Sequence, residues 1–297
     1  MASSDISNVV LLCIVNIIFM VAGSFLNSVV IISIRRSRQL RKKLCYFIIL
    51  VLSFFDFAVV SITHPLLITS TIYYSLDEIS KTREDITGSV SFLLCGFSMT
   101  ALLTLNIERF LALTYPYLHE RSVTKAKLVC LQSFFVIVII GMWPLSFVNT
   151  KTLLAVQIFI VVFMSLLFSL LSCGNYRMFK IAKSKSADKR VSPSAATSGS
   201  KIRRKRIVIS FKNISTCFLV VGCFFFCSCP RIIYSTLLFS TQMSPYDRQE
   251  LLILKLWSTT FVSINSTVNC LIFFWRNSIL RREGMKLIDG FRRRLFN

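Results

Sequence analysis

Five polar side chains lie inside long apolar stretches of this chain, at spacings that allow them to meet. They are Asp56, Ser98, Asn265, Ser266 and Asn269. If these stretches cross a membrane, an aspartate near its centre costs on the order of 2.5–3.5 kcal/mol even on lenient insertion scales. Asp56 is therefore expected to face other polar groups inside a helix bundle, and not lipid.

The spacing of these residues favours a shared site. Asn265 and Asn269 are four residues apart and Ser266 precedes Asn269 by three, so on a helix all three lie along one stripe. Carboxylate, amide and hydroxyl oxygens are the ligands that hard cations prefer. The cluster therefore predicts either a pocket for a hard cation or a network of hydrogen bonds among the side chains and ordered water.

A second polar group is the triplet Glu108-Arg109-Phe110, on the same apolar stretch as Ser98. Arg109 follows Ser98 by 11 residues, which is three helical turns, or about 16 Å, along one face of a helix. When Ser98 lies in the middle of a membrane, Arg109 therefore reaches one of its edges.

Arg231 is a third candidate, because it follows Pro230 within apolar sequence. A guanidinium in that setting is costly unless it is paired. It is expected to pair with Glu84 or Asp85, or to extend to the membrane surface. The alternative is contact with an anionic ligand, and the sequence leaves both interpretations open.

The elements that would hold these residues are seven apolar stretches. The chain has 297 residues, 54% of them hydrophobic, with 27 phenylalanines and a mean hydropathy of +0.67, which is atypical of a soluble domain. A membrane-spanning helix needs about 20 apolar residues. The candidate spans are 8–34, 44–74, 86–112, 125–147, 152–178, 207–239 and 251–274.

These spans predict an all-α membrane protein, a seven-transmembrane helix bundle. Residues 1–7 form a short extracellular N-terminus, and residues 8–274 form the seven-transmembrane domain. Residues 275–297 form a basic cytoplasmic tail with a short amphipathic helix after the seventh span. No sequence repeat is visible, which disfavours a transporter built from duplicated halves.

The net charge of +22 is concentrated in alternate loops. Basic residues cluster over 35–43, 180–206 and 276–294, whereas the loops at 77–85 and 247–250 carry acids. The positive-inside rule then places the N-terminus outside and the C-terminus in the cytoplasm. This distribution favours anionic membrane lipid as the partner, at about 1 kcal/mol per basic residue near the surface, and excludes nucleic acid.

An enzyme is not expected. A membrane hydrolase with zinc would need several histidines and acids at one depth, but the two histidines, His64 and His119, are predicted on opposite sides of the membrane. His64, beside Pro65, is interpreted as part of a polar wall and not as a pH switch.

Several motifs carry a resemblance to one family. Glu108-Arg109-Phe110 resembles its Asp-Arg-Tyr motif, and Tyr176 its fifth-helix tyrosine. Phe224 lies six residues before Pro230, as in its sixth-helix switch region, and the segment 265–273 resembles its seventh-helix motif. With these motifs in this order over residues 20–295, the chain resembles the rhodopsin-like (class A) G-protein-coupled receptors, as a divergent, orphan-type member.

The resemblance implies a plasma-membrane receptor that converts binding of an extracellular ligand into activation of a heterotrimeric G protein. It implies coupling roles for Glu108, Arg109, Phe110, Tyr176, Phe224, Pro230, Asn269 and Phe273. It implies a ligand pocket that includes Ser91, Cys95, Ser228, Arg231 and Ser263. It also implies that the five-residue polar cluster binds an allosteric sodium ion, and no other cofactor is expected.

The chain departs from the family pattern at informative positions. Glu84 stands where the cysteine of the outer disulfide is usual, and Ser91 and Ser263 replace the amine-binding aspartate and the retinal lysine, which disfavours both ligand classes. Ser228 replaces the sixth-helix tryptophan. Ser210 falls about where an acidic partner of Arg109 would sit, so the inactive state is expected to be weakly held. A non-signalling decoy or scaffold of the same fold remains the alternative.

Overall fold

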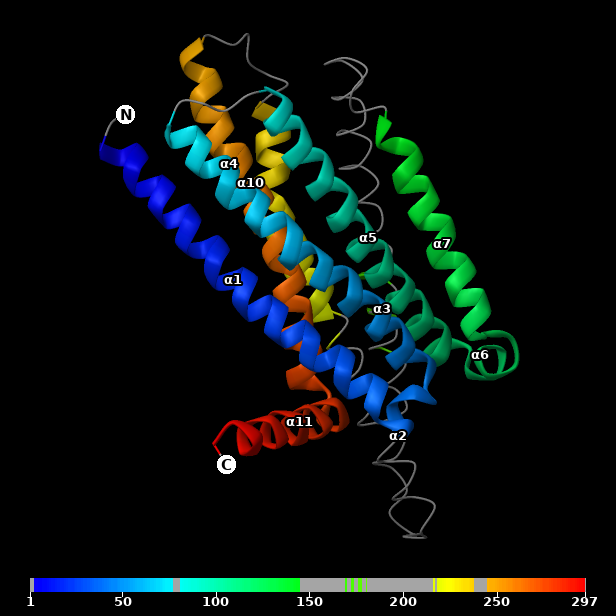
Figure 1. Cartoon of the computed structure of the whole chain (residues 1–297). Coiled ribbons are helices and arrows are strands. Elements are labelled where there is room, and N and C mark those ends of the chain that lie inside the picture. The colour runs from blue at the N-terminus through cyan, green and yellow to red at the C-terminus, as the bar shows by residue number, and fades with distance from the viewer. Residues whose placement is uncertain are drawn as a thin grey trace.

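The structure is a computed structural model that describes residues 3–76, 81–144, 218–237 and 245–296, and seven single helical positions. These positions are Ser169, Ser172, Cys173, Tyr176, Arg177, Lys180 and Thr216. The long helices are α1 (Ser3–Arg36), α5 (Lys81–Thr114), α7 (Lys125–Met142), the helix Phe218–Leu237 and α10 (Pro245–Arg276). They run alongside one another as a bundle (Figure 1).

The second span consists of three consecutive helical segments, α3 (Leu44–Ala58), η1 (Val59–Thr63) and α4 (His64–Ser75). The middle segment, η1, is a π-helical turn that directly precedes Pro65. Proline lacks an N–H and its ring crowds the carbonyl four residues back, and a π-turn is one way to accommodate that loss. This interruption was not predicted from the sequence.

Six helices in the described part of the chain are long and apolar enough to cross a membrane. They correspond to six of the seven expected spans, and the expectation of an all-α membrane bundle is confirmed. The expected span 152–178 lies outside the described residues, except for five helical positions between Ser169 and Arg177. Residues 207–217 of the expected span 207–239, except Thr216, and residues 238–239 also lie outside them.

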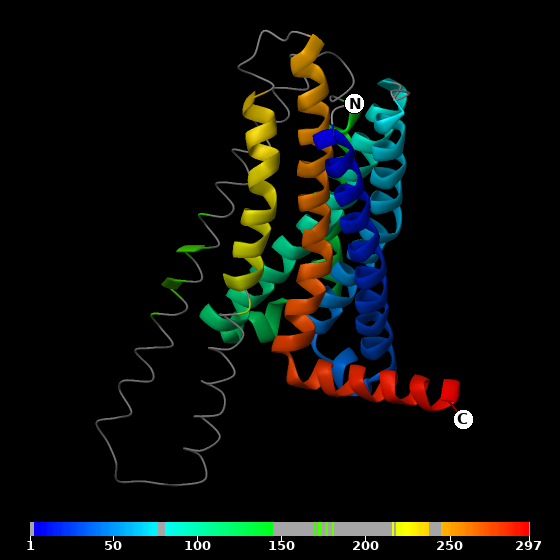
Figure 2. The same ribbon diagram turned by 90° about the vertical axis from the view of Figure 1, so that its left-hand side faces the viewer.

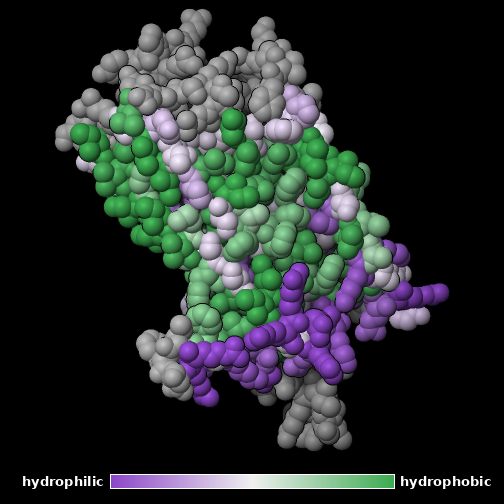
Figure 3. All heavy atoms as spheres, in the orientation of Figure 1, coloured by the Kyte–Doolittle hydropathy of each residue, from purple (hydrophilic) through white to green (hydrophobic). Residues whose placement is uncertain are grey.

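The flank of the bundle is apolar, as lipid requires. Large apolar side chains point outward along α7 and the helix Phe218–Leu237, where Ile137 is 67% and Phe226 76% exposed. Figure 3 shows the hydrophobic flank and, at one end, a concentration of hydrophilic residues. Conversely, the interior holds fully buried polar side chains such as Asn16, Asn27 and Thr260.

Three helices lie at that hydrophilic end, which we call the α11 end. They are α2 (Arg38–Arg41), α6 (Pro116–Ser122) and α11 (Ser278–Phe296), and α11 crosses the end of the bundle (Figure 2). Asn277 caps α11 by accepting a hydrogen bond from the Leu280 N–H at 3.1 Å, and it also accepts one from the Tyr46 hydroxyl at 3.0 Å. The opposite end, where α1 and α10 begin, is the N-terminal end.

The apolar core packs α1, α3, α5 and α10 together, and α11 contributes to it through the fully buried Leu280. Helices approach one another closely at Gly23 of α1. A Cβ atom built there would lie 2.3 Å from the Thr267 hydroxyl of α10 and 2.7 Å from a Val60 methyl of η1. Glycine is therefore required at this crossing.

Candidate functional site

The predicted polar cluster meets at one place in the bundle. Asp56 of α3 is 1% exposed and accepts a short hydrogen bond from the Ser98 hydroxyl of α5. Ser266 and Asn269 of α10 face the same carboxyl group. Asn265 lies one turn from Asn269 and is also buried. Three spans thus supply one oxygen-rich site, as their spacing predicts.

Several atoms of this cluster make no hydrogen bond to any described residue. They are Oδ1 of Asn265 and both Oδ1 and Nδ2 of Asn269. Buried polar atoms are normally satisfied by protein, water or an ion. Two of these three atoms are oxygens, and Asn269 also faces the buried Asp56 carboxyl group. The set of ligand atoms therefore fits a hard monovalent cation with water.

A second cluster surrounds Glu108 at the α11 end of α5. Its Oε1 lies 3.0 Å from Nε2 of His119, and its Oε2 lies 3.7 Å from Nε of Arg109. The first contact is a hydrogen bond, whereas Oε2 makes none within the described part of the chain. Arg109 therefore has an ion pair with Glu108 that lacks a direct hydrogen bond.

His119 was not expected here, since the sequence analysis considered it only as a zinc ligand. Pro116 begins α6, and this short helix brings His119 back to Glu108 across 11 residues of chain. Pro at the first position of a helix is a local signal for α6, but no local pattern indicates which side chain His119 meets.

The remaining predicted coupling residues are dispersed along the helices. Phe273 and Asn269 are buried in α10, Phe224 packs against the main core, and Pro230 is partly buried. Phe110 is partly buried on α5. Tyr176 is helical and its side chain is 63% exposed.

Among the predicted ligand-pocket residues, Cys95 of α5 and Ser263 of α10 are neighbours, with Sγ and Oγ 3.8 Å apart. Ser91 is buried and its hydroxyl has no partner among the described residues. Ser228 is partly buried on the helix that also carries Arg231. The pocket residues thus come from three helices.

The expected pairing of Arg231 with Glu84 is wrong. Arg231 donates from Nη1 to the Thr259 hydroxyl at 3.4 Å and lies 5.2 Å from the centre of the Tyr234 ring. Glu84 instead pairs with Lys255 of α10, with Nζ and Oε1 2.5 Å apart. Lys255 was not predicted as a site residue, because this contact joins residues 171 positions apart and has no local signature. The side chain of Asp85 lies outside the described residues.

Sequence reasoning also missed a buried network between α1, α4 and α10. Nδ1 of His64 lies 2.6 Å from Oδ1 of Asn16, whose amide nitrogen donates to the Thr260 hydroxyl at 3.0 Å. All three side chains are fully buried. His64 is therefore an interhelical contact, which accords with its interpretation as part of a polar wall.

The sequence matches the model of a known protein family. The model of the family described as "7 transmembrane receptor (rhodopsin family)" matches residues 26–273, which include every residue of the polar cluster and of the Glu108 cluster. No curated protein matches the chain.

Proposed function

The chain belongs to the rhodopsin family of seven-transmembrane receptors, and on that premise we propose that it converts binding of an extracellular ligand into activation of a heterotrimeric G protein. The observation that carries the proposal is the Glu108–Arg109 pair at one end of α5. The same helix carries Ser98 in the polar cluster and Ser91 and Cys95 nearer the N-terminal end. One rigid element therefore joins a candidate ligand region to a candidate coupling region.

We propose that the α11 end faces the cytoplasm of a plasma-membrane receptor. The helices α2 and α11 at this end are rich in basic residues, and Figure 3 shows hydrophilic residues gathered there. The positive-inside rule favours that orientation, and anionic lipid of the inner leaflet would bind the same residues. The N-terminus and the pocket around Arg231 are then extracellular, and a buried guanidinium favours an anionic ligand.

The proposed mechanism is a shift between two states of the bundle. Pro230 lacks the N–H of one intrahelical hydrogen bond, so the helix Phe218–Leu237 can hinge there. In this structure Nε of Arg276, at the end of α10, lies 3.4 Å from the Thr216 hydroxyl below that helix. Outward movement of the cytoplasmic part of the helix would separate this pair and expose Arg109 to the G protein.

The first test measures activity without any ligand. The ion pair between Arg109 and Glu108 spans 3.7 Å and contains no direct hydrogen bond. Ser210, which lies outside the described residues, falls about where the resemblance implies an acidic partner of Arg109. We expect basal guanine-nucleotide exchange on at least one Gα class above that of mock-transfected membranes. Glu108→Gln should raise this exchange several-fold, because the neutral amide no longer attracts the guanidinium.

Glu120→Gln on the exposed face of α6 is the matched control and should leave exchange unchanged. A non-signalling decoy or scaffold predicts a different result. Neither wild type nor Glu108→Gln would then stimulate exchange on any Gα class, although both reach the cell surface at equal levels. A transporter would likewise give no exchange.

We further propose that the polar cluster binds sodium. Asp56, Ser98, Asn265, Ser266 and Asn269 would supply its oxygen ligands, and the ion would balance the buried carboxylate. The amide oxygens of Asn265 and Asn269, which have no hydrogen-bond partner among the described residues, support this assignment. An ion that binds only the inactive state stabilises that state by mass action.

Asp56→Asn tests the sodium site by removing its formal charge while keeping its shape. In wild type, replacing about 100 mM choline chloride by sodium chloride should lower basal nucleotide exchange and raise the midpoint of thermal unfolding. The variant should fold and show neither response. A sodium response that survives in Asp56→Asn would leave only the hydrogen-bond network.

A further inference from the structure

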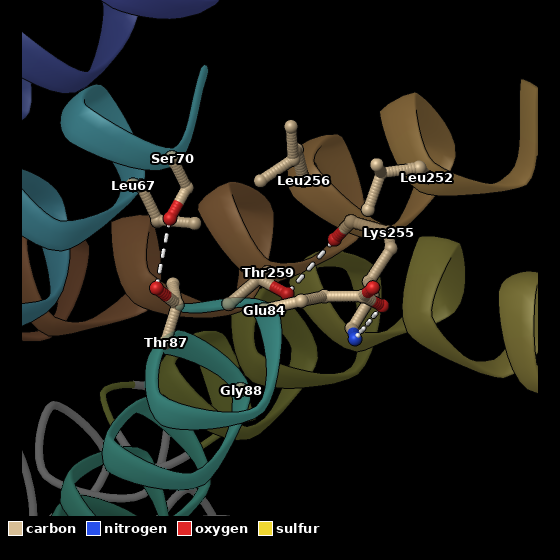
Figure 4. A pocket seen from close by; sticks show the side chains of 9 residues that line it. All are labelled: Leu67, Ser70, Glu84, Thr87, Gly88, Leu252, Lys255, Leu256 and Thr259. Atoms are coloured by element: carbon tan, nitrogen blue, oxygen red, sulfur yellow. Dashed lines mark hydrogen bonds and ion pairs between the residues drawn. The ribbon is translucent and has the colours of Figure 1, made fainter. Parts of the chain in front are cut away.

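The pair of Glu84 and Lys255 occupies the N-terminal end of the bundle, between α5 and α10. The two charged atoms are 2.5 Å apart, and the side chains are only 27% and 18% exposed. Apolar walls on both sides come from Leu67 of α4 and Leu252 and Leu256 of α10 (Figure 4). The ammonium group thus lies in a partly desolvated setting where a carboxylate partner matters.

Hydroxyl groups complete the surroundings of this pair. Ser70 and Thr87 hydrogen-bond to each other at 2.8 Å, and the Thr259 hydroxyl donates to the Lys255 carbonyl at 2.8 Å (Figure 4). The cavity enclosed by these residues measures about 10 Å³, which is room for about one water molecule. The Glu84 side chain therefore occupies space that a ligand would need.

Arg231 adds a second positive charge beside the same cavity. Its Nη1 lies 3.4 Å from the Thr259 hydroxyl, and Thr259 lines the cavity. Lys255 and Arg231 thus both contact Thr259, and Glu84 pairs with Lys255. Removing an acid from a partly buried lysine without replacement is costly, whereas exchanging one carboxylate for another leaves the charge paired.

From these observations we propose that Lys255 and Arg231 form a carboxylate-binding site, and that Glu84 is its internal competitor. A ligand with a carboxylate group and an apolar body would replace the Glu84 carboxylate on Lys255 and pack against the leucines. Release of Glu84 would free α5 from α10 at the N-terminal end. The biological role of this site rests on the proposed receptor function. The binding site itself is defined by the contacts above.

The alternative is that the pair is only a structural connection between α5 and α10. Glu84 stands where the family has its disulfide cysteine, so a connecting role alone would explain an ion pair at this position. The two interpretations differ in one respect: a structural connection requires the covalent Glu84 side chain, whereas a carboxylate site accepts a free carboxylate in its place.

Chemical rescue distinguishes them. Glu84→Ala removes a fragment with the size and charge of acetate, and the whole receptor in lipid nanodiscs is then titrated with sodium acetate or the neutral acetamide, at constant sodium. We expect millimolar acetate to recover at least half of the loss in thermal unfolding midpoint caused by Glu84→Ala, and acetamide to recover none. Glu84→Ala/Lys255→Met should show no recovery by acetate.

Glu283→Ala is the matched control, because Glu283 pairs at 3.1 Å with Lys286 of α11, whose side chain is 65% exposed. It should not respond to acetate. If Glu84→Ala fails to fold, Glu84→Gln keeps the shape of the side chain, and saturation-transfer NMR should show acetate binding about tenfold tighter than in wild type. Equal rescue by acetamide, rescue that persists without Lys255, or unchanged acetate affinity in Glu84→Gln would overturn the proposal.

These readouts are independent of G-protein coupling. Acetate rescue with no nucleotide exchange in any variant would refute the receptor function and keep the site. Nucleotide exchange with no acetate rescue would refute the site and keep the receptor function.

Discussion

Arg109→Lys should reach the cell surface at near-normal levels and lose most G-protein activation, at least tenfold in the rate of guanine-nucleotide exchange. As the family resemblance implies, coupling depends on a planar guanidinium that reaches backbone carbonyls and the Tyr176 hydroxyl. An ammonium group is a compact charge with a different donor geometry, so it reproduces those contacts poorly. The measurement is exchange on purified Gα in membranes with matched receptor density.

The substitution keeps the net charge at +22, so a global electrostatic effect is removed. Simple anchoring of a helix end to phospholipid requires only charge, and lysine would serve as well as arginine. Arg121→Lys, on the exposed surface of α6, is the matched control and should couple normally. Full activation by Arg109→Lys would show that charge alone suffices at this position and would refute the proposed coupling role of the guanidinium.

The parts of the site predicted correctly are those where a polar residue interrupts an apolar stretch. Asp56 is conspicuous in such a stretch, and helix periodicity aligns Asn265 with Asn269 without any knowledge of the other helices. Ser98 joins them because its distance from Arg109 along α5 determines its depth. The spacing of residues along the sequence was sufficient to predict this cluster, and the structure brings these residues together.

The contacts that sequence reasoning missed are the pairwise ones. Glu84 has two possible basic partners, Lys255 and Arg231. Only the packing of α5 against α10 selects Lys255 as the partner. His119 meets Glu108 because α6 turns back after α5. Such choices depend on the relative rotation of helices, which periodicity within one helix does not specify.

In the fold, too, patterns within one helix were predicted and contacts between helices were not. Apolar length predicted where helices cross the membrane, and the basic amphipathic pattern predicted a helix after the seventh span, observed as α11. The π-turn η1 was missed although Pro65 marks its position, since proline can be accommodated by a kink, a break or an inserted residue. Which of these occurs depends on packing against other helices, and η1 packs Val60 close to Gly23 of α1.

That crossing at Gly23 leads to a second large expected effect. Gly23→Ala places a methyl group 2.3 Å from the Thr267 hydroxyl and 2.7 Å from a Val60 methyl, on two different elements. Thr267 also donates to the Phe19 carbonyl of α1 at 3.3 Å, so α1 and α10 separate only if this hydrogen bond breaks. Overpacking typically costs about 1–3 kcal/mol, and α1 must shift because neither neighbour is the end of a long flexible side chain.

We therefore expect Gly23→Ala to lower the midpoint of thermal unfolding by on the order of 5 °C and to reduce surface expression. Gly141→Ala is the control, since no described atom lies within 4 Å of its added Cβ and alanine favours a helix over glycine by roughly 1 kcal/mol. Its midpoint should stay equal or rise. Gly23→Ala/Thr267→Ala/Val60→Ala removes both clashing groups and should recover part of the loss. If Gly23→Ala had the same midpoint of thermal unfolding as Gly141→Ala, α1 would not pack against η1 and α10 at this glycine. The His64–Asn16 contact, on the same face of α1, would then lose its structural basis.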